Sequence, residues 1–161
     1  MKKGIKFLLF AAIASTSLLS ALSCSKEDKA TPDEEIIFNG NEIGNGDQEF
    51  EIKGDHTISK GTYVLKGWVY VTSGSTLTIE AGTVIRGDKA TKAALIVERG
   101  GKIIARGTSS RPIVFTSNQA AGSRKPGDWG GLIICGKAVN NKGEMIIEGG
   151  PRSMHGGSDN G

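Results

Sequence analysis

The stretch that decides the fold is VTSGSTLTIEAG, which spans residues 71–82. A second stretch, VERGGKIIARG at residues 97–107, repeats its pattern at an offset of 26 residues, counted from Val71 to Val97. Four pairs of positions share this offset: Val71 and Val97, Gly74 and Gly100, Leu77 and Ile103, and Ile79 and Ala105. A fixed offset of this size is typical of stacked repeats, in which one unit is too small to bury its apolar face alone.

Apolar and polar residues alternate inside each repeat, and this period of two is that of a β-strand. The alternation predicts side chains that face the interior (Leu77, Ile79, Val97 and Ile103) and side chains that face outward (Thr76, Thr78 and Lys102). Short strands with glycine corners and no helical stretch between them predict an all-β coil of strands, a parallel β-helix.

The expected strands of the first coil are residues 68–71, 76–79 and 83–86, and those of the second are 94–97, 102–105 and 113–116. A third coil is expected to begin at 131–134 and to return through 145–148, while strands within 50–65 close the N-terminal end of the stack. Because no apolar cap follows residue 148, we expect the β-helix domain, residues 50–161, to be truncated at its C-terminal end.

The first 23 residues have the pattern of a secretory signal peptide. Lys2, Lys3 and Lys6 form a basic head, and an apolar run without charge follows from Phe7 to Leu22. This run is shorter than the roughly 20 predominantly apolar residues that span a bilayer, so we expect it to be a cleaved signal.

Cys24 directly follows the small residue Ser23, at the point where a signal peptidase would cut. This arrangement resembles the lipobox of bacterial lipoproteins, although Ala21 and Leu22 depart from its usual order of a leucine and then a small residue. The acidic segment Ser25 to Asp28 resembles the signal that exports Bacteroidota lipoproteins to the cell surface. The resemblance implies lipid attachment at Cys24 and an outer-membrane location, exposed on the cell surface or, alternatively, facing the periplasm.

Residues 24–49 are expected to be the acylated N-terminus and a flexible linker, because Asn, Asp and Gly cluster in them as they do in turns. The same cluster does not have the alternating oxygen ligands of an EF-hand calcium loop. Without Lys2, Lys3 and Lys6 the 20 basic residues fall to 17, equal to the 17 acidic residues. A neutral mature chain without a basic cluster is not expected to bind nucleic acid.

Three segments of the β-helix region resemble a family of right-handed β-helix proteins that is common in Bacteroidota and other Gram-negative bacteria. They are residues 71–87, 111–117 and the Gly-Asp-Trp-Gly-Gly segment that begins at Gly127. The resemblance covers roughly residues 60–161 and implies the N-terminal part of a longer domain. It implies the fold more than an activity.

The sequence contains no convincing catalytic, metal-binding or cofactor-binding set. The candidate acids are Glu80, Asp88, Glu98, Asp128 and Glu148, and none of them recurs at the offset that would stack two carboxylates on adjacent coils. Cys135 lies in an apolar run, where cysteine behaves as a small hydrophobe, and His56 and His155 are distant from it in sequence. We therefore predict no catalytic residue, no metal and no cofactor.

Asp128 and Trp129 are the one pair of residues that suggests a ligand site. A tryptophan ring is a good platform for sugar rings, and the neighbouring carboxylate would accept hydroxyl hydrogen bonds. They end a polar excursion, residues 117–130, of the kind that often lies on the binding face of repeat proteins. The alternative is structural, with Trp129 packing at a corner and Asp128 capping backbone N–H groups in a turn.

The favoured function is a non-catalytic, lipid-anchored cell-envelope protein whose β-helix binds glycans or an outer-membrane protein partner, or serves as a scaffold for one. A polysaccharide lyase or glycoside hydrolase with its active site in coils beyond Gly161 is one alternative. A structural stalk or adhesin segment is the other.

Overall fold

The computed structural model describes residues 38–157. All described residues belong to one compact unit of the chain. The predicted signal peptide, Cys24 and the first part of the predicted linker therefore lie outside the described residues. Among the described residues no helix is long and apolar enough to cross a membrane.

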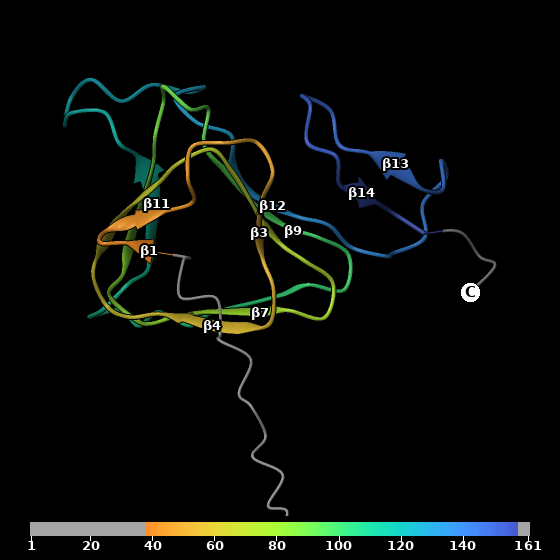
Figure 1. The fold of residues 1–161 in the computed structure, drawn as a ribbon, viewed down its shortest axis with the longest axis horizontal. Coiled ribbons are helices and arrows are strands. Elements are labelled where there is room, and N and C mark those ends of the chain that lie inside the picture. The colour runs from red at the N-terminus through yellow and green to blue at the C-terminus, as the bar shows by residue number, and fades with distance from the viewer. Residues whose placement is uncertain (1–37, 158–161) are drawn as a thin grey trace, which may run out of the picture. The chain divides into compact units, whose positions relative to one another are not determined.

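Every regular element in the described range is a β-strand, and most strands belong to three stacked sheets. Sheet A contains β1 (Phe38–Asn39), β2 (Glu42–Ile43), β5 (Thr62–Leu65), β8 (Val84–Gly87) and β11 (Val114–Ser117). Sheet B contains β3 (Phe50–Ile52), β6 (Trp68–Val71), β9 (Ala94–Val97) and β12 (Gly131–Ile134). Sheet C contains β4 (Asp55–Ile58), β7 (Thr76–Ile79) and β10 (Lys102–Ala105). The chain visits the sheets in the repeating order A, B, C, so each circuit is one coil of a parallel β-helix (Figure 1).

The register of the parallel strands confirms the repeat. Val71 pairs with Val97 in sheet B, and Leu77 and Ile79 pair with Ile103 and Ala105 in sheet C. The Gly74 N–H donates to the Gly100 carbonyl at 2.9 Å, so the corners between these strands stack as well. This offset holds only between these two coils. In sheet A, for example, Leu65 lies opposite Gly87, because the corners between the strands differ in length from coil to coil.

The stack begins before the predicted start at residue 50. Glu42 and Ile43 pair with Val64 and Leu65 in parallel, although residues 24–49 were predicted as a linker. Ile43 is only 1% exposed and belongs to the interior core, so one apolar side chain draws this short segment into the first coil. The antiparallel strand β1 then covers the edge of β2.

The interior of the coil is apolar and follows the predicted alternation. Leu77, Ile79 and Val97 are buried in it, and Ile103 packs against it half-buried. Of the residues predicted to face outward, Thr76 and Thr78 are half-buried and Lys102 is exposed. The predicted inward and outward faces of the stack are therefore confirmed.

The outer face of sheet B is covered, which the alternation did not predict. All four residues of β9 are buried, and Tyr70, Ala94 and Ile96 form a second apolar cluster with Cys135 on this face. Trp68, Ile133 and Ile147 pack against that cluster. Sheet B therefore carries apolar contacts on both faces, as strands of buried parallel sheets do.

The covering segment comes from the C-terminal part of the described chain. Residues Met145–Ile146 form β13, which pairs antiparallel with β14, Met154–His155. The prediction that 145–148 returns to the stack as a strand of the third coil is therefore wrong. The physical reason is that the outer face of sheet B needs an apolar cover, and Ile147 supplies part of it.

Arg152 fastens this hairpin to sheet B. Its guanidinium lies 4.5 Å from the centre of the Tyr70 ring. It also forms ion pairs with Glu49 at 2.7 Å, with Glu51, and with Glu98 at 3.6 Å. A guanidinium that stacks on an aromatic ring while pairing with several carboxylates holds its segment more firmly than an isolated surface ion pair does.

Candidate functional site

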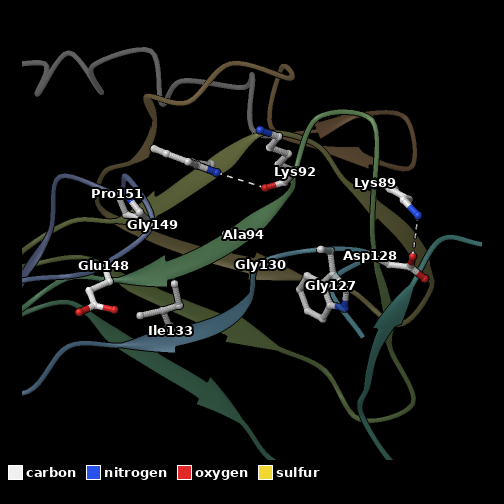
Figure 2. Close-up of a pocket in the computed structure, with 12 residues that line it drawn as sticks. Lys89, Lys92, Ala94, Gly127, Asp128, Gly130, Ile133, Glu148, Gly149 and Pro151 are labelled. Carbon is white, nitrogen blue, oxygen red and sulfur yellow. Dashed lines mark hydrogen bonds and ion pairs between the residues drawn. The ribbon is translucent and has the colours of Figure 1, made fainter. Parts of the chain in front are cut away.

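The hairpin and sheet B enclose a cavity of about 330 Å³, which we call the tryptophan cavity. Ala94 of β9 and Ile133 of β12 form its floor, and Trp68 and Trp129 are in its walls. Figure 2 shows Lys89 and Asp128 at one side of this floor and Glu148 and Pro151 at the other. The cavity therefore combines apolar surface with charged groups at its edges.

Trp129 is positioned by a glycine beneath it. A methyl group at Gly87 would come within 2.3 Å of the Trp129 ring, so the ring lies directly against the backbone of β8. Trp129 is half-buried and packs against the interior core. One part of the indole thus stabilises a corner of the coil while the remainder contributes to the tryptophan cavity.

Trp68 is held by a contact with the neighbouring turn. Its indole N–H donates to the Lys92 carbonyl at 3.1 Å. Asp88 fixes the same turn, because its carboxylate accepts hydrogen bonds from the backbone N–H and the hydroxyl of Thr91. The two aromatic walls are therefore set in place without a ligand.

Lys92 is the one non-glycine residue of the described chain with a positive φ, at 52°. Such a conformation is uncommon for a residue with a side chain, and it occurs more often at functional sites than elsewhere. Here it places Lys92 among the residues that line the tryptophan cavity. The sequence analysis did not single out Lys92, Lys89 or Trp68 as candidate site residues. The polar segment 88–92 between two strands could have indicated the two lysines.

Asp128 is buried, at 2% exposure, and both oxygens of its carboxylate accept hydrogen bonds. One oxygen accepts a hydrogen bond from the Lys89 ammonium at 3.1 Å. The other accepts from the Lys125 backbone N–H and the Ser117 hydroxyl, both at 2.8 Å. These bonds, led by that from the Lys125 backbone, lower the pKa of Asp128 to about 2. The geometry is that of the structural alternative, a carboxylate that holds a turn together.

We expect this carboxylate to make the fold sensitive to acid. Because its folded pKa lies below its usual value near 3.9, the contribution of Asp128 to stability is complete above about pH 4 and is lost as the pH falls through about 2. Urea unfolding at pH 4, 3 and 2 should show that wild type loses more stability over this interval than Asp128→Asn does. Identical pH profiles for the two proteins would refute this assignment.

A family model described as a pectate-lyase-like beta helix domain matches residues 50–161. The chain belongs to this family. No curated protein and no solved structure gives a significant match.

In this pectate-lyase-like β-helix, four of the five predicted candidate acids (Glu80, Asp88, Glu98 and Asp128) each accept hydrogen bonds from a different residue or set of residues. Glu80 accepts a hydrogen bond from the Lys60 backbone N–H at 2.9 Å, and Glu98 accepts one from the Ser153 hydroxyl at 3.0 Å. Asp128 and Glu148 both line the tryptophan cavity, on opposite sides of it in Figure 2. Within residues 38–157 no group of three or more histidine, cysteine or acidic side chains is arranged to hold a metal ion.

Cys135 lies against the outer face of sheet B as part of its apolar cluster. Burial raises the pKa of the thiol, and the nearby Glu98 carboxylate raises it further. A thiol with a raised pKa is mostly protonated at neutral pH and is a poor nucleophile. The position agrees with the interpretation of Cys135 as a packing residue.

Proposed function

We propose that this protein is a non-catalytic, lipid-anchored cell-envelope protein whose β-helix binds glycans in the tryptophan cavity. The observation that carries the proposal is the presence of two fixed tryptophan side chains in the walls of one preformed cavity. Aromatic rings offer flat apolar faces to the C–H groups of sugars, and surrounding polar groups set the orientation of the hydroxyls.

The volume and lining of the cavity support a small part of a glycan as the occupant. A volume of about 330 Å³ lies at the lower end of the roughly 300–1,000 Å³ range of ligand pockets. Lys92 and Glu148 supply a donor and an acceptor at its edges, and neither side chain forms an ion pair within the described residues. The carboxylate of Asp128 supports the walls and does not contact the sugar.

The proposal is tested with a glycan array, followed by titration of the bound glycan into the purified mature protein. Lys92→Gln and Glu148→Gln should each weaken binding, whereas the exposed Lys102→Gln on sheet C should not. Failure to bind any glycan, or equal affinities for all four proteins, would count against the cavity as a glycan site. Depolymerisation of a polysaccharide by residues 24–161 would overturn the non-catalytic assignment.

The family description favours one other candidate function, that of a polysaccharide lyase. On this alternative the tryptophan cavity holds part of the polymer, and the catalytic residues belong to coils beyond Gly161. Glu80, Glu98 and Asp128 each accept a hydrogen bond from a different residue. Within the described residues, this arrangement supports the binding function over the catalytic one.

The proposed lipid anchor is attached to Cys24, and mass spectrometry of the intact mature protein tests it. We expect the membrane-bound mature protein to lack Met1–Ser23 and to carry a mass increase that matches a diacylglyceryl group plus one acyl chain. Several chains on one residue anchor a protein firmly, where a single chain is marginal. A Cys24→Ala protein that still sediments with membranes would argue against the anchor.

A further inference from the structure

A second cavity lies on the other side of the coil, at the corner where the chain leaves sheet C for sheet A. Its volume is about 470 Å³, and we call it the corner cleft. Thr78 and Ile104, outward-facing residues of β7 and β10, contribute to its wall on sheet C. The charged residues that line it are Lys60, Glu80, Arg106 and Arg111.

The three cations of the corner cleft come from two coils, which lie on either side of the coil that contains β7. Lys60 follows β4, and Arg106 and Arg111 follow β10, two coils further along the stack. Between them lies Gly82, where an added methyl group would be 3.4 Å from the Lys60 side chain and 3.6 Å from the Arg111 side chain. Because Gly82 has no side chain, the Lys60 side chain and the base of the Arg111 side chain border the same open corner.

Within residues 38–157, no carboxylate forms an ion pair with the cations of the corner cleft, Lys60, Arg106 and Arg111. The single carboxylate, that of Glu80, accepts a hydrogen bond from the backbone N–H of Lys60. Three positive side chains and one negative side chain leave the cleft with an excess of two positive charges.

We propose that the corner cleft binds a phosphate monoester. Such a group carries a charge of about −1.5 to −2 at neutral pH, which balances the excess charge of the cleft, and its oxygens accept several hydrogen bonds. Two guanidinium groups offer the paired N–H donors that match phosphate geometry, and a lysine adds a point charge. A carboxylate or a sulfate ester, with a single charge, leaves part of the positive charge uncompensated.

Titration of glucose 1-phosphate into the mature protein at low ionic strength tests the site. Lys60→Gln and Arg111→Gln should each weaken binding by about ten-fold or more, because each removes a charged donor. Glu80→Gln should strengthen binding by about two- to five-fold, since it removes a like charge and retains an acceptor for the Lys60 N–H. Lys102→Gln, an exposed cation outside the cleft, is the matched control.

Weaker binding by Lys60→Gln and Arg111→Gln, together with stronger binding by Glu80→Gln, would distinguish a binding site from a cluster of charges that only supports the fold. Equal affinities in all variants, or weakening by Lys102→Gln as large as that by Arg111→Gln, would overturn the proposal. A drop in affinity between pH 7.5 and 5.5, as the phosphate dianion takes up one proton near pH 6, would support it. Thermal unfolding of each variant verifies that the fold is retained.

The source of the phosphate is identified by comparing two probes. Binding of glucose 1-phosphate, but not of phosphatidylcholine vesicles that contain phosphatidic acid, would assign the cleft to a phosphorylated glycan. The reverse result would assign it to a lipid head group, and either result supports the phosphate site. Binding of inorganic phosphate without binding of either ester would overturn the proposal.

Discussion

Val97→Asp is expected to lower the free energy of unfolding by about 4 kcal/mol or more, enough to unfold many proteins of this size. Val97 is 1% exposed and lies between Val71 and Ile134 in the ladder of sheet B. A carboxylate at this position would be buried in the apolar core without a hydrogen-bonding partner. Urea unfolding followed by circular dichroism measures the loss.

Thr78→Asp is the matched control for this substitution. Thr78 lies on β7 with its side chain outward and half-buried, so an aspartate there keeps contact with water. Its expected cost is about 1 kcal/mol or less, which reflects the low strand propensity of aspartate. Similar small losses for Val97→Asp and Thr78→Asp would contradict the assignment of the two faces.

Trp129→Ala is expected to have the second largest effect, because it acts on stability and on glycan binding together. The indole rests on the backbone at Gly87 and packs against the interior core, so its removal leaves a gap at that corner. We expect a loss of about 2–4 kcal/mol, at the lower end for a tryptophan because the ring is half-buried. The same substitution removes one aromatic wall of the tryptophan cavity and should weaken glycan binding more than ten-fold.

Trp129→Phe separates these two effects. A phenyl ring retains part of the contact with Gly87, so this variant should unfold at nearly the wild-type temperature and bind glycan with intermediate affinity. Affinity is measured well below the unfolding temperature of each protein. Unchanged affinity in a folded Trp129→Ala protein would exclude this tryptophan as part of the glycan site.

The register between two neighbouring coils of the stack was predictable from a few residues. Val71 and Val97 share an offset with Leu77 and Ile103, and a parallel stack places residues at a constant offset opposite one another. The same residues show the period of two that separates interior from surface. Both signals are local and repeated, so neither depends on knowledge of distant contacts.

The structural role of Asp128 was one of two interpretations that its sequence context allowed. A glycine-rich turn is compatible with a ligand site and with a capped loop, and residues 127–131 alone do not separate them. Its partner Lys89 is 39 residues away in sequence. Only the fold brings this ammonium to the carboxylate, and that contact, together with burial, supports the structural interpretation of Asp128.

The sequence by itself thus determined the coil, the register between its two repeated turns and the orientation of their side chains, because each of these follows from a pattern that repeats along the chain. Tertiary structure alone decided that β13 leaves the stack and that the segment between β13 and β14 lies against sheet B, and so creates the tryptophan cavity. The contact that fastens this hairpin joins Arg152 to Glu49 across 103 residues. The apolar run of β9 showed that a cover was needed, but the covering segment is chosen by contacts between residues that no local pattern connects.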